Sequence, residues 1–221
     1  WYSANAEAGV NAVRAALAIG LVWLWAICLT INWAANWEGL RHEDWRYPLV
    51  RARAGRAARW ADLFGIHLFP TVQVFLGCLP IYAVMTRGQA PLSWLDAIAA
   101  VVTLGAIAIE ALADTQLHAF IAQQRPGAVI RAGLWAWSRH PNYVFQWLGW
   151  MAYPVIAFDP AQPVTWLTFT APAVMYGLLR YVSGVPPLES AMLESRGEAF
   201  RDYQRRVSVF FPLPPKRVSD A

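Results

Sequence analysis

Residues 92–120 read LSWLDAIAAVVTLGAIAIEALADTQLHAF. The stretch is apolar as far as Ile109 and follows Pro91, a residue type that suits the first turn of a helix. It is longer than the roughly 20 helical residues that cross the hydrocarbon core of a bilayer. Backbone polar groups cannot bond to water inside a bilayer, and the sequence shows no alternating pattern of barrel strands. A membrane-spanning α-helix is therefore expected here.

Four further apolar runs are long enough to span, at about residues 10–33, 63–85, 141–158 and 164–182. We therefore expect an all-α, polytopic transmembrane helix bundle with five spans, in a single domain covering residues 1–221. Pro70 and Pro80 are expected to kink the second span. Apolar and charged residues are mixed at 187–206, which predicts an amphipathic helix on the cytoplasmic surface or over a site. An extended segment should follow at 211–215.

Composition supports a membrane protein and excludes several classes. The sequence is 57% hydrophobic and 14% charged, whereas soluble domains carry about 25% charged residues. The net charge of +4 does not predict nucleic-acid binding, because the arginines lie between apolar runs rather than on one soluble face. Cys28 and Cys78 lie within apolar runs and predict no disulfide framework. The chain starts without Met and without a signal-peptide pattern, so we expect a native N-terminal piece to be missing.

Basic residues are distributed unevenly among the connecting segments. Arginines fill the segments at 41–59 and 125–139, and basic residues recur from 196 onward. The other two connecting segments hold Arg87 and no further basic residue. The positive-inside rule therefore predicts that the Arg-rich segments and the C-terminus are cytoplasmic.

Polar residues end the third span. Glu110, Asp114, His118, Ile121 and Arg125 fall within about 80° of one face of the expected helix. Ionisable groups at such a depth usually face a cavity or a partner. Two carboxylates one turn apart repel each other unless something binds them, which favours a binding site. The alternative is a helix that emerges into water, with these residues as solvated caps.

A second motif spans residues 133–143, GLWAWSRHPNY. Pro141 predicts a helix start, and helix N-termini beside basic residues bind anions. Asn142 and Gln146 then lie one turn apart. The alternative is an interfacial anchor of Trp and Arg side chains.

Two shorter motifs complete the set of candidates. Residues 43–47, EDWRY, offer ionic pairing and an aromatic ring, or a structural loop clamp. Residues 182–189, VSGVPPLE, place Glu189 at a helix start, either as a site residue or as a cap. The sequence contains neither a Walker loop nor a Gly-x-Gly-x-x-Gly fingerprint, and we expect no metal, because no Cys-x-x-Cys or His-Glu-x-x-His pattern occurs.

These motifs together, with Tyr203-Gln-Arg-Arg and Phe211-Pro212, resemble a bacterial branch of the steroid 5α-reductase family from about residue 30 onward. The resemblance implies a seven-helix bundle that binds NADPH among the cytoplasmic helix ends, five helices of which lie in this chain. It implies a bacterial inner-membrane location. Gln146 stands where the family usually has Glu, and Glu189 falls near a family His. The implied cofactor-binding residues are Arg46, Tyr47, Glu110, Asp114, Arg125 (or Gln124), Arg131, Trp135, Arg139, His140, Asn142, Tyr143, Gln146 and Glu189.

The resemblance implies reduction of the 4,5 double bond of 3-oxo-4-ene steroids or similar lipophilic enones. Asn32 and Glu43 are the weak catalytic candidates within the chain, because the family's main acid would lie before Trp1. The expected partners are a steroid-like substrate and membrane lipids. One alternative is an S-adenosylmethionine-dependent methyltransferase of the isoprenylcysteine type, which carries a similar Arg-His-Pro-x-Tyr motif. The number of arginines available for phosphates favours the reductase. A transport or assembly subunit without enzymatic activity is the other alternative.

Overall fold

The computed structural model describes residues 11–35, 37, 39, 43–44, 46–86, 91–123 and 125–216. Two compact units divide the chain. The first unit holds the described residues up to Ala97 together with Tyr153–Pro172, and the second holds Ile98–Ala152 and the described residues from Ala173 onward. The described residues form helices and irregular segments, with one isolated bridge between Ser138 and Ser208.

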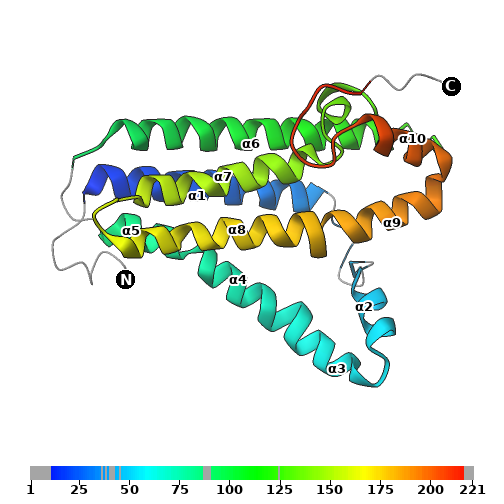
Figure 1. The fold of residues 1–221 in the computed structure, drawn as a ribbon, viewed down its shortest axis with the longest axis horizontal. Coiled ribbons are helices and arrows are strands. Elements are labelled where there is room, and N and C mark those ends of the chain that lie inside the picture. The colour runs from blue at the N-terminus through cyan, green and yellow to red at the C-terminus, as the bar shows by residue number, and fades with distance from the viewer. Residues whose placement is uncertain are drawn as a thin grey trace. The chain divides into compact units, whose positions relative to one another are not determined.

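The first unit contains α1 and a long helical run whose pitch changes along its length (Figure 1). Pro70 lies at the start of α4 and Pro80 at the start of α5, so each proline lies in the first turn of a helical element. The kinks expected at these prolines stay predictions. Its elements are α1 (Ala12–Ala35), α2 (Arg46–Ala54), η2 (Gly55–Ala57), α3 (Ala58–Trp60), the π-helix η3 (Ala61–Leu68), α4 (Phe69–Gly77), α5 (Leu79–Thr86) and η5 (Pro163–Phe169).

A buried ion pair stabilises one end of the first unit. Arg14 of α1 donates to Asp96, near the start of α6, at 2.8 Å, and both side chains are almost completely buried. The same arginine donates to the Pro91 carbonyl at 2.7 Å, while the backbone N–H and hydroxyl of Ser93 donate to Asp96. A buried ion pair is stable only when its remaining polar atoms are also bonded, and these contacts meet that condition.

The second unit is built from the remaining helices, and α9 and α10 follow each other near the C-terminus (Figure 1). Helices α6 and α7 approach closely at Gly149, where an added Cβ atom would lie 3.6 Å from the Cβ of Ala106. Its elements are α6 (Trp94–Ile121), η4 (Gly133–Ala136), α7 (Pro141–Ala157), α8 (Thr170–Gly177), the π-helix η6 (Leu178–Val182), α9 (Val185–Arg196) and α10 (Glu198–Arg206), with α6, α7 and α8 contributing to both units.

The chain is a helical membrane protein. Among the described residues, three helical runs are long and apolar enough to span a bilayer: Ala12–Ala35, Arg46–Met85 and Trp94–Ile121. The other two predicted spans, at 141–158 and 164–182, are helical, but they are not among the runs that are both long and apolar enough to span. Helix α7 has 17 residues, or ~25 Å at 1.5 Å per residue. Large apolar side chains such as Trp23, Phe75 and Val101 are about two-thirds exposed, as lipid-facing residues would be.

Three local predictions need correction. The Arg-rich segment expected to connect the first two spans is helical from Arg46 onward and continues directly into the second span. Helix α6 ends at Ile121, so Arg125 lies in the following segment and does not continue the polar face of the helix. The predicted amphipathic helix at 187–206 is two helices, because Gly197 has φ +51° and interrupts the run between α9 and α10. A positive φ of this kind strains residues other than glycine. Residues 212–216 are non-helical, as predicted.

Candidate functional site

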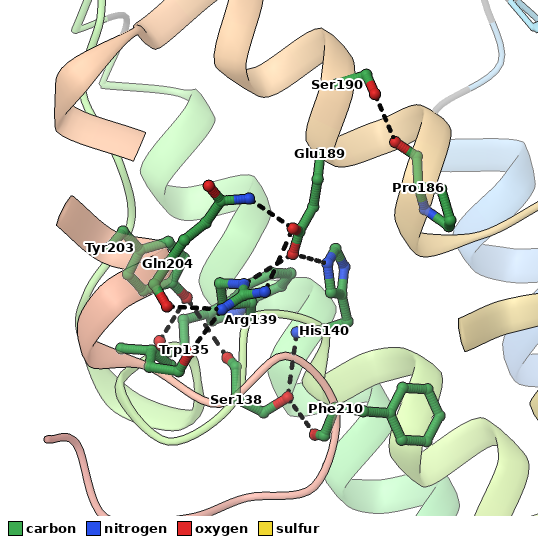
Figure 2. Close-up of polar contacts among 11 residues, drawn as sticks. Trp135, Ser138, Arg139, His140, Pro186, Glu189, Ser190, Tyr203, Gln204 and Phe210 are labelled. Carbon is green, nitrogen blue, oxygen red and sulfur yellow. Dashed lines mark hydrogen bonds and ion pairs between the residues drawn. The ribbon is translucent and has the colours of Figure 1, made fainter. Parts of the chain in front are cut away.

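Three side chains of the second unit converge on one carboxylate (Figure 2). Glu189 of α9 accepts hydrogen bonds from Arg139 Nε at 2.7 Å and from Gln204 Nε2 of α10 at 2.7 Å. The His140 Nε2 atom lies 3.0 Å from the same carboxylate. We call Glu189, Arg139, His140 and Gln204 the Glu189 cluster. It joins the segment before α7 to both C-terminal helices.

The environment of Glu189 keeps it ionised. Burial by itself would raise the pKa of the carboxyl, but hydrogen bonds from His140 and Arg139 and the charge of Arg139 lower the pKa to about 2. The carboxylate is therefore negative at any physiological pH. It serves as a fixed anion that orients Arg139 and His140.

Arg139 is held on the opposite side by the C-terminal tail. Its Nη1 atom donates to the backbone carbonyls of Gln204 at 3.0 Å and Val207 at 2.7 Å. Its backbone N–H donates to the Ser208 carbonyl at 2.8 Å. The adjacent Ser138 hydroxyl donates to the carbonyl of Phe210, as Figure 2 shows. The tail and the segment before α7 therefore form one structure.

Aromatic side chains anchor this structure to α6 and α7. The Tyr203 hydroxyl donates to the Trp135 carbonyl at 2.6 Å, and the Trp135 indole N–H donates to the Ala113 carbonyl of α6 at 3.0 Å. Burial raises the pKa of Tyr203, so its hydroxyl stays protonated as a donor. Phe210 is fully buried against Trp147 and Tyr176.

A cavity of about 150 Å³ lies next to the Glu189 cluster. Most of its wall is apolar, and its basic lining residues are Arg139, His140 and Arg196. Arg196 donates to the Ala128 carbonyl at 2.7 Å and also contacts Met192. The apolar wall is formed by Leu117, Phe120, Ile121, Ala128, Val129, Ile130, Trp135, Leu188, Met192, Phe200 and Tyr203. The cavity suits a flat or aliphatic group rather than a free anion.

A second polar pair joins α6 to α7. Asn142 Nδ2 donates to Asp114 Oδ1 at 3.1 Å, so the two helices are neighbours at this level. Glu110 is half-buried one turn before Asp114, and its carboxylate makes no hydrogen bond within the described part of the chain. Gln146 is half-buried one turn after Asn142. We call Glu110, Asp114, Asn142 and Gln146 the α6–α7 polar group.

Of the remaining predicted residues of the second unit, some contact other protein groups, one is exposed, and one is not among the described residues. Arg131 pairs with Asp202 at 2.7 Å and donates to the Ala199 carbonyl. The ring of Tyr143 stacks on His140 with 5.4 Å between centroids. Arg125 is exposed. Gln124 lies outside the described residues.

Four predicted residues belong to the first unit. Asn32 is half-buried in α1, and Tyr47 lies in the first turn of α2. Arg46 pairs with Asp44 at 2.6 Å, and Glu43 pairs with Arg51 at 2.5 Å. These two ion pairs match the structural loop clamp that the sequence left open.

Sequence reasoning missed three residues of the second unit. Gln204 completes the Glu189 cluster, Ser138 ties the segment before α7 to the tail, and Gln116 accepts a hydrogen bond from the Leu134 N–H at 3.0 Å. Gln204 and Ser138 lie inside motifs that were recognised, Tyr-Gln-Arg-Arg and Ser-Arg-His-Pro. Their position in those motifs was the signal from which their role could have been predicted. Gln116 carried none beyond its place on the polar end of a span.

The fold and these two groups define a helical membrane protein with an ordered polar region at the ends of α6, α7 and α9. The chain belongs to the family DUF1295, described as "Protein of unknown function", whose profile matches residues 1–207. It is 26% identical over 216 residues to the uncharacterized protein C594.04c of Schizosaccharomyces pombe. That match covers 86% of this chain and 60% of the relative's length. No solved structure matches the chain.

Proposed function

We propose that the protein is an NADPH-dependent membrane reductase that reduces the conjugated double bond of lipophilic enones, such as the 4,5 double bond of 3-oxo-4-ene steroids. The observation that carries the proposal is the α6–α7 polar group. Two motifs that resemble those of steroid 5α-reductases are joined by the Asp114–Asn142 hydrogen bond. Beside them, the Glu110 carboxylate has no hydrogen-bond donor within the described residues, so it is available to a ligand.

The α6–α7 polar group fits the hydroxyl and amide groups of a dinucleotide. Carboxylates accept hydrogen bonds from ribose hydroxyls, a contact that other dinucleotide-binding proteins also use. Glu110 and Asp114 would accept such bonds, and Asn142 can both donate and accept. The cavity of about 150 Å³ is smaller than the ~300–1,000 Å³ of a typical ligand pocket, so it would hold one ring of the cofactor.

Fewer arginines are available to bind the cofactor phosphates than the number of arginines in the sequence suggested. Arg139 makes bonds to Glu189 and to two backbone carbonyls, and Arg131 is bonded to Asp202 and Ala199. The hydrogen bonds of these two side chains are therefore used within the protein, where they hold the C-terminal helices to the segment before α7. Arg125 is exposed and makes no ion pair within the described part of the chain. It is the member of the predicted set that would contact a phosphate.

When bound, the reduced nicotinamide supplies the hydride. The protein's part is to position the cofactor through Asp114 and Asn142 and to keep water out with the apolar wall around Trp135. The apolar spans allow a lipophilic substrate to arrive from the bilayer. Asn32 remains the candidate within this chain for polarising the ketone oxygen, because its amide can donate a hydrogen bond. Glu43 pairs with Arg51, and an ionised carboxylate has no proton to donate.

The test is cofactor binding by Asp114→Ala and Asn142→Ala variants in detergent or nanodiscs. Loss of a ligand hydrogen bond costs about 0.5–1.5 kcal/mol, so each variant should bind NADPH up to roughly tenfold more weakly. The matched control is Thr115→Ala, because Thr115 is exposed on α6 and its hydroxyl donates to the Ala111 carbonyl of its own helix. Unchanged affinity in both site variants, with normal melting temperatures, would remove these residues from the cofactor site.

Titration calorimetry on the wild-type protein separates the alternative functions. The reductase proposal requires that wild-type protein bind NADPH more tightly than S-adenosylmethionine. A preference for adenosylmethionine would establish the methyltransferase alternative instead. Binding of neither compound to folded protein would favour a transport or assembly role and contradict both enzymes.

A further inference from the structure

A second hollow, of about 270 Å³, lies beside the C-terminal tail. Arg205 and Arg206 line it from the end of α10, Lys216 from the tail, and Arg139 from the segment before α7. None of the lining residues is acidic. We call this feature the tail hollow. It shares Arg139 with the cavity at the Glu189 cluster but is otherwise lined by different residues.

Positive charge exceeds negative charge around the tail hollow. Among the residues that the structure describes, the ion pairs around α10 use three carboxylates, those of Glu189, Glu198 and Asp202. Five arginines share them, and they are Arg131, Arg139, Arg201, Arg205 and Arg206. Lys216 adds a further positive charge. An excess of this kind attracts an anion from outside the chain.

Two donors in the tail hollow are available to a ligand. Lys216 is exposed and makes no ion pair within the described residues, although its backbone N–H bonds to the Arg206 carbonyl at 2.8 Å. That backbone bond keeps the lysine beside the arginines of α10. Ser208 also lines the hollow, and its hydroxyl makes no hydrogen bond in the described part of the chain. An ammonium, guanidinium groups and a hydroxyl are the usual protein partners of phosphate.

Apolar side chains flank these donors. Leu213 lines the tail hollow and is 55% exposed, and Phe211 nearby is 46% exposed. Exposed apolar groups beside cations are typical of surfaces that meet the lipid headgroup region. We propose that the tail hollow binds a phosphate group, presented by the headgroup of an anionic phospholipid. The proposal does not depend on the reductase activity.

Lys216 provides a direct probe, because it is the only lysine in the sequence. The rate at which an amine-reactive acetylating reagent modifies it is measured by mass spectrometry of the C-terminal peptide. Protein in nanodiscs of phosphatidylglycerol is compared with protein in nanodiscs of phosphatidylcholine. A third sample adds inorganic phosphate to the phosphatidylcholine nanodiscs, with chloride at equal ionic strength as its reference. Occupation of the tail hollow should slow acetylation several-fold.

A matched pair of variants distinguishes a site from a general surface effect. Arg201 and Arg205 both pair with Glu198 from α10, but only Arg205 lines the tail hollow. Arg205→Gln should remove most of the protection, whereas Arg201→Gln should retain it. Arg205 is exposed by more than half, so folding should survive, and melting temperatures check this. A second measurement does not use acetylation: the amount of phosphatidylglycerol that co-purifies is compared between wild type and Lys216→Gln.

Each outcome decides the proposal. Protection by phosphatidylglycerol that Arg205→Gln removes and Arg201→Gln retains supports a lipid headgroup site. Protection by inorganic phosphate alone, with the same variant pattern, supports the phosphate site and overturns the lipid as its source. Equal slowing in all variants would be an effect of the charged bilayer surface and would overturn the site. Unchanged acetylation in every sample would overturn it as well.

Discussion

Glu189 shows how one side chain organises a region built from distant parts of the sequence. Its donors lie 50 and 49 residues before it, in Arg139 and His140, and 15 residues after it, in Gln204. In the folded protein, three protein groups take the place of water around its carboxylate. These contacts are needed because burial alone would disfavour the charged form. Such a group stabilises the fold only while all its donors remain in place.

Glu189→Gln should destabilise the protein by about 1.5–3 kcal/mol, the usual worth of hydrogen bonds to a charged group. The amide removes the negative charge that Arg139 needs, and leaves that guanidinium partly buried without a counter-ion. The melting temperature should fall clearly in detergent. Glu194→Gln is the matched control, because Glu194 lies exposed on the same helix and makes no ion pair with any described residue. Equal melting temperatures for the two variants would contradict the stabilising role.

The stability difference between wild type and Glu189→Gln should depend on pH with a defined sign. The pKa of Glu189 is lowered from 4.5 to about 2 in the folded protein. A lowered folded-state pKa adds stability above the unfolded value, and that stability disappears as the pH falls toward the folded value. The melting-temperature gap between wild type and Glu189→Gln should therefore be constant above about pH 5 and narrow between pH 4.5 and 2. A gap that widens in acid would refute this assignment.

At the scale of elements, the break between α9 and α10 decides what the C-terminal region can contact. Gly197 has φ +51° and ψ −124°, and this turn lets α10 direct Gln204 and Tyr203 toward the segment before α7. A continuous helix would carry those side chains away from Glu189 and Trp135. The glycine is therefore needed for its backbone conformation, since an added Cβ would meet no atom within 4 Å.

Gly197→Ala should destabilise the protein by about 1–3 kcal/mol, the usual cost of a sparsely populated backbone conformation. Gly105→Ala is the control, because Gly105 lies within α6 at an ordinary φ and an added Cβ there also meets no atom within 4 Å. That control should leave stability unchanged or raise it by up to about 1 kcal/mol. Melting temperatures of both variants check the prediction, and a neutral Gly197→Ala would show that the turn carries no strain for alanine.

At the scale of the whole molecule, the charge pattern predicts an orientation in the membrane. The Arg-rich segments and the C-terminal helices should face the cytoplasm, and the segment around Gln162 should face outward. This orientation would place the Glu189 cluster and the α6–α7 polar group where a soluble dinucleotide is available, while the spans contact the lipophilic substrate.

Single cysteines test the orientation in a Cys28→Ala, Cys78→Ala background. A membrane-impermeant maleimide added to intact cells should label Gln162→Cys but not Ser195→Cys, since both positions are exposed and lie on opposite predicted sides. Opening the membrane should make Ser195→Cys reactive. Labelling in the reverse order would overturn the orientation, and with it the cytoplasmic position of the candidate site.

Local sequence was sufficient for the apolar helices and many of their boundaries, but it did not predict that residues 46–60 are helical. Apolar length predicted the membrane-spanning character of residues 94–121, and proline chemistry predicted the start of α7 at Pro141. These features depend on the bilayer and on backbone restrictions that act within a few residues. The break at Gly197 was missed, because apolar and charged residues continue across it in a pattern that fits a single amphipathic helix.

The partners of the polar residues were decided only by the tertiary structure. The motifs identified Arg131, Arg139 and Glu189 as important but could not show that they bond to Asp202, to tail carbonyls and to one another. The Asp114–Asn142 pair likewise depends on α6 and α7 being neighbours across 28 residues of sequence. A side chain's type and spacing determine what it can bond to. Which partner it meets depends on the packing of helices far apart in the chain, because that packing sets which donors and acceptors lie within hydrogen-bond distance.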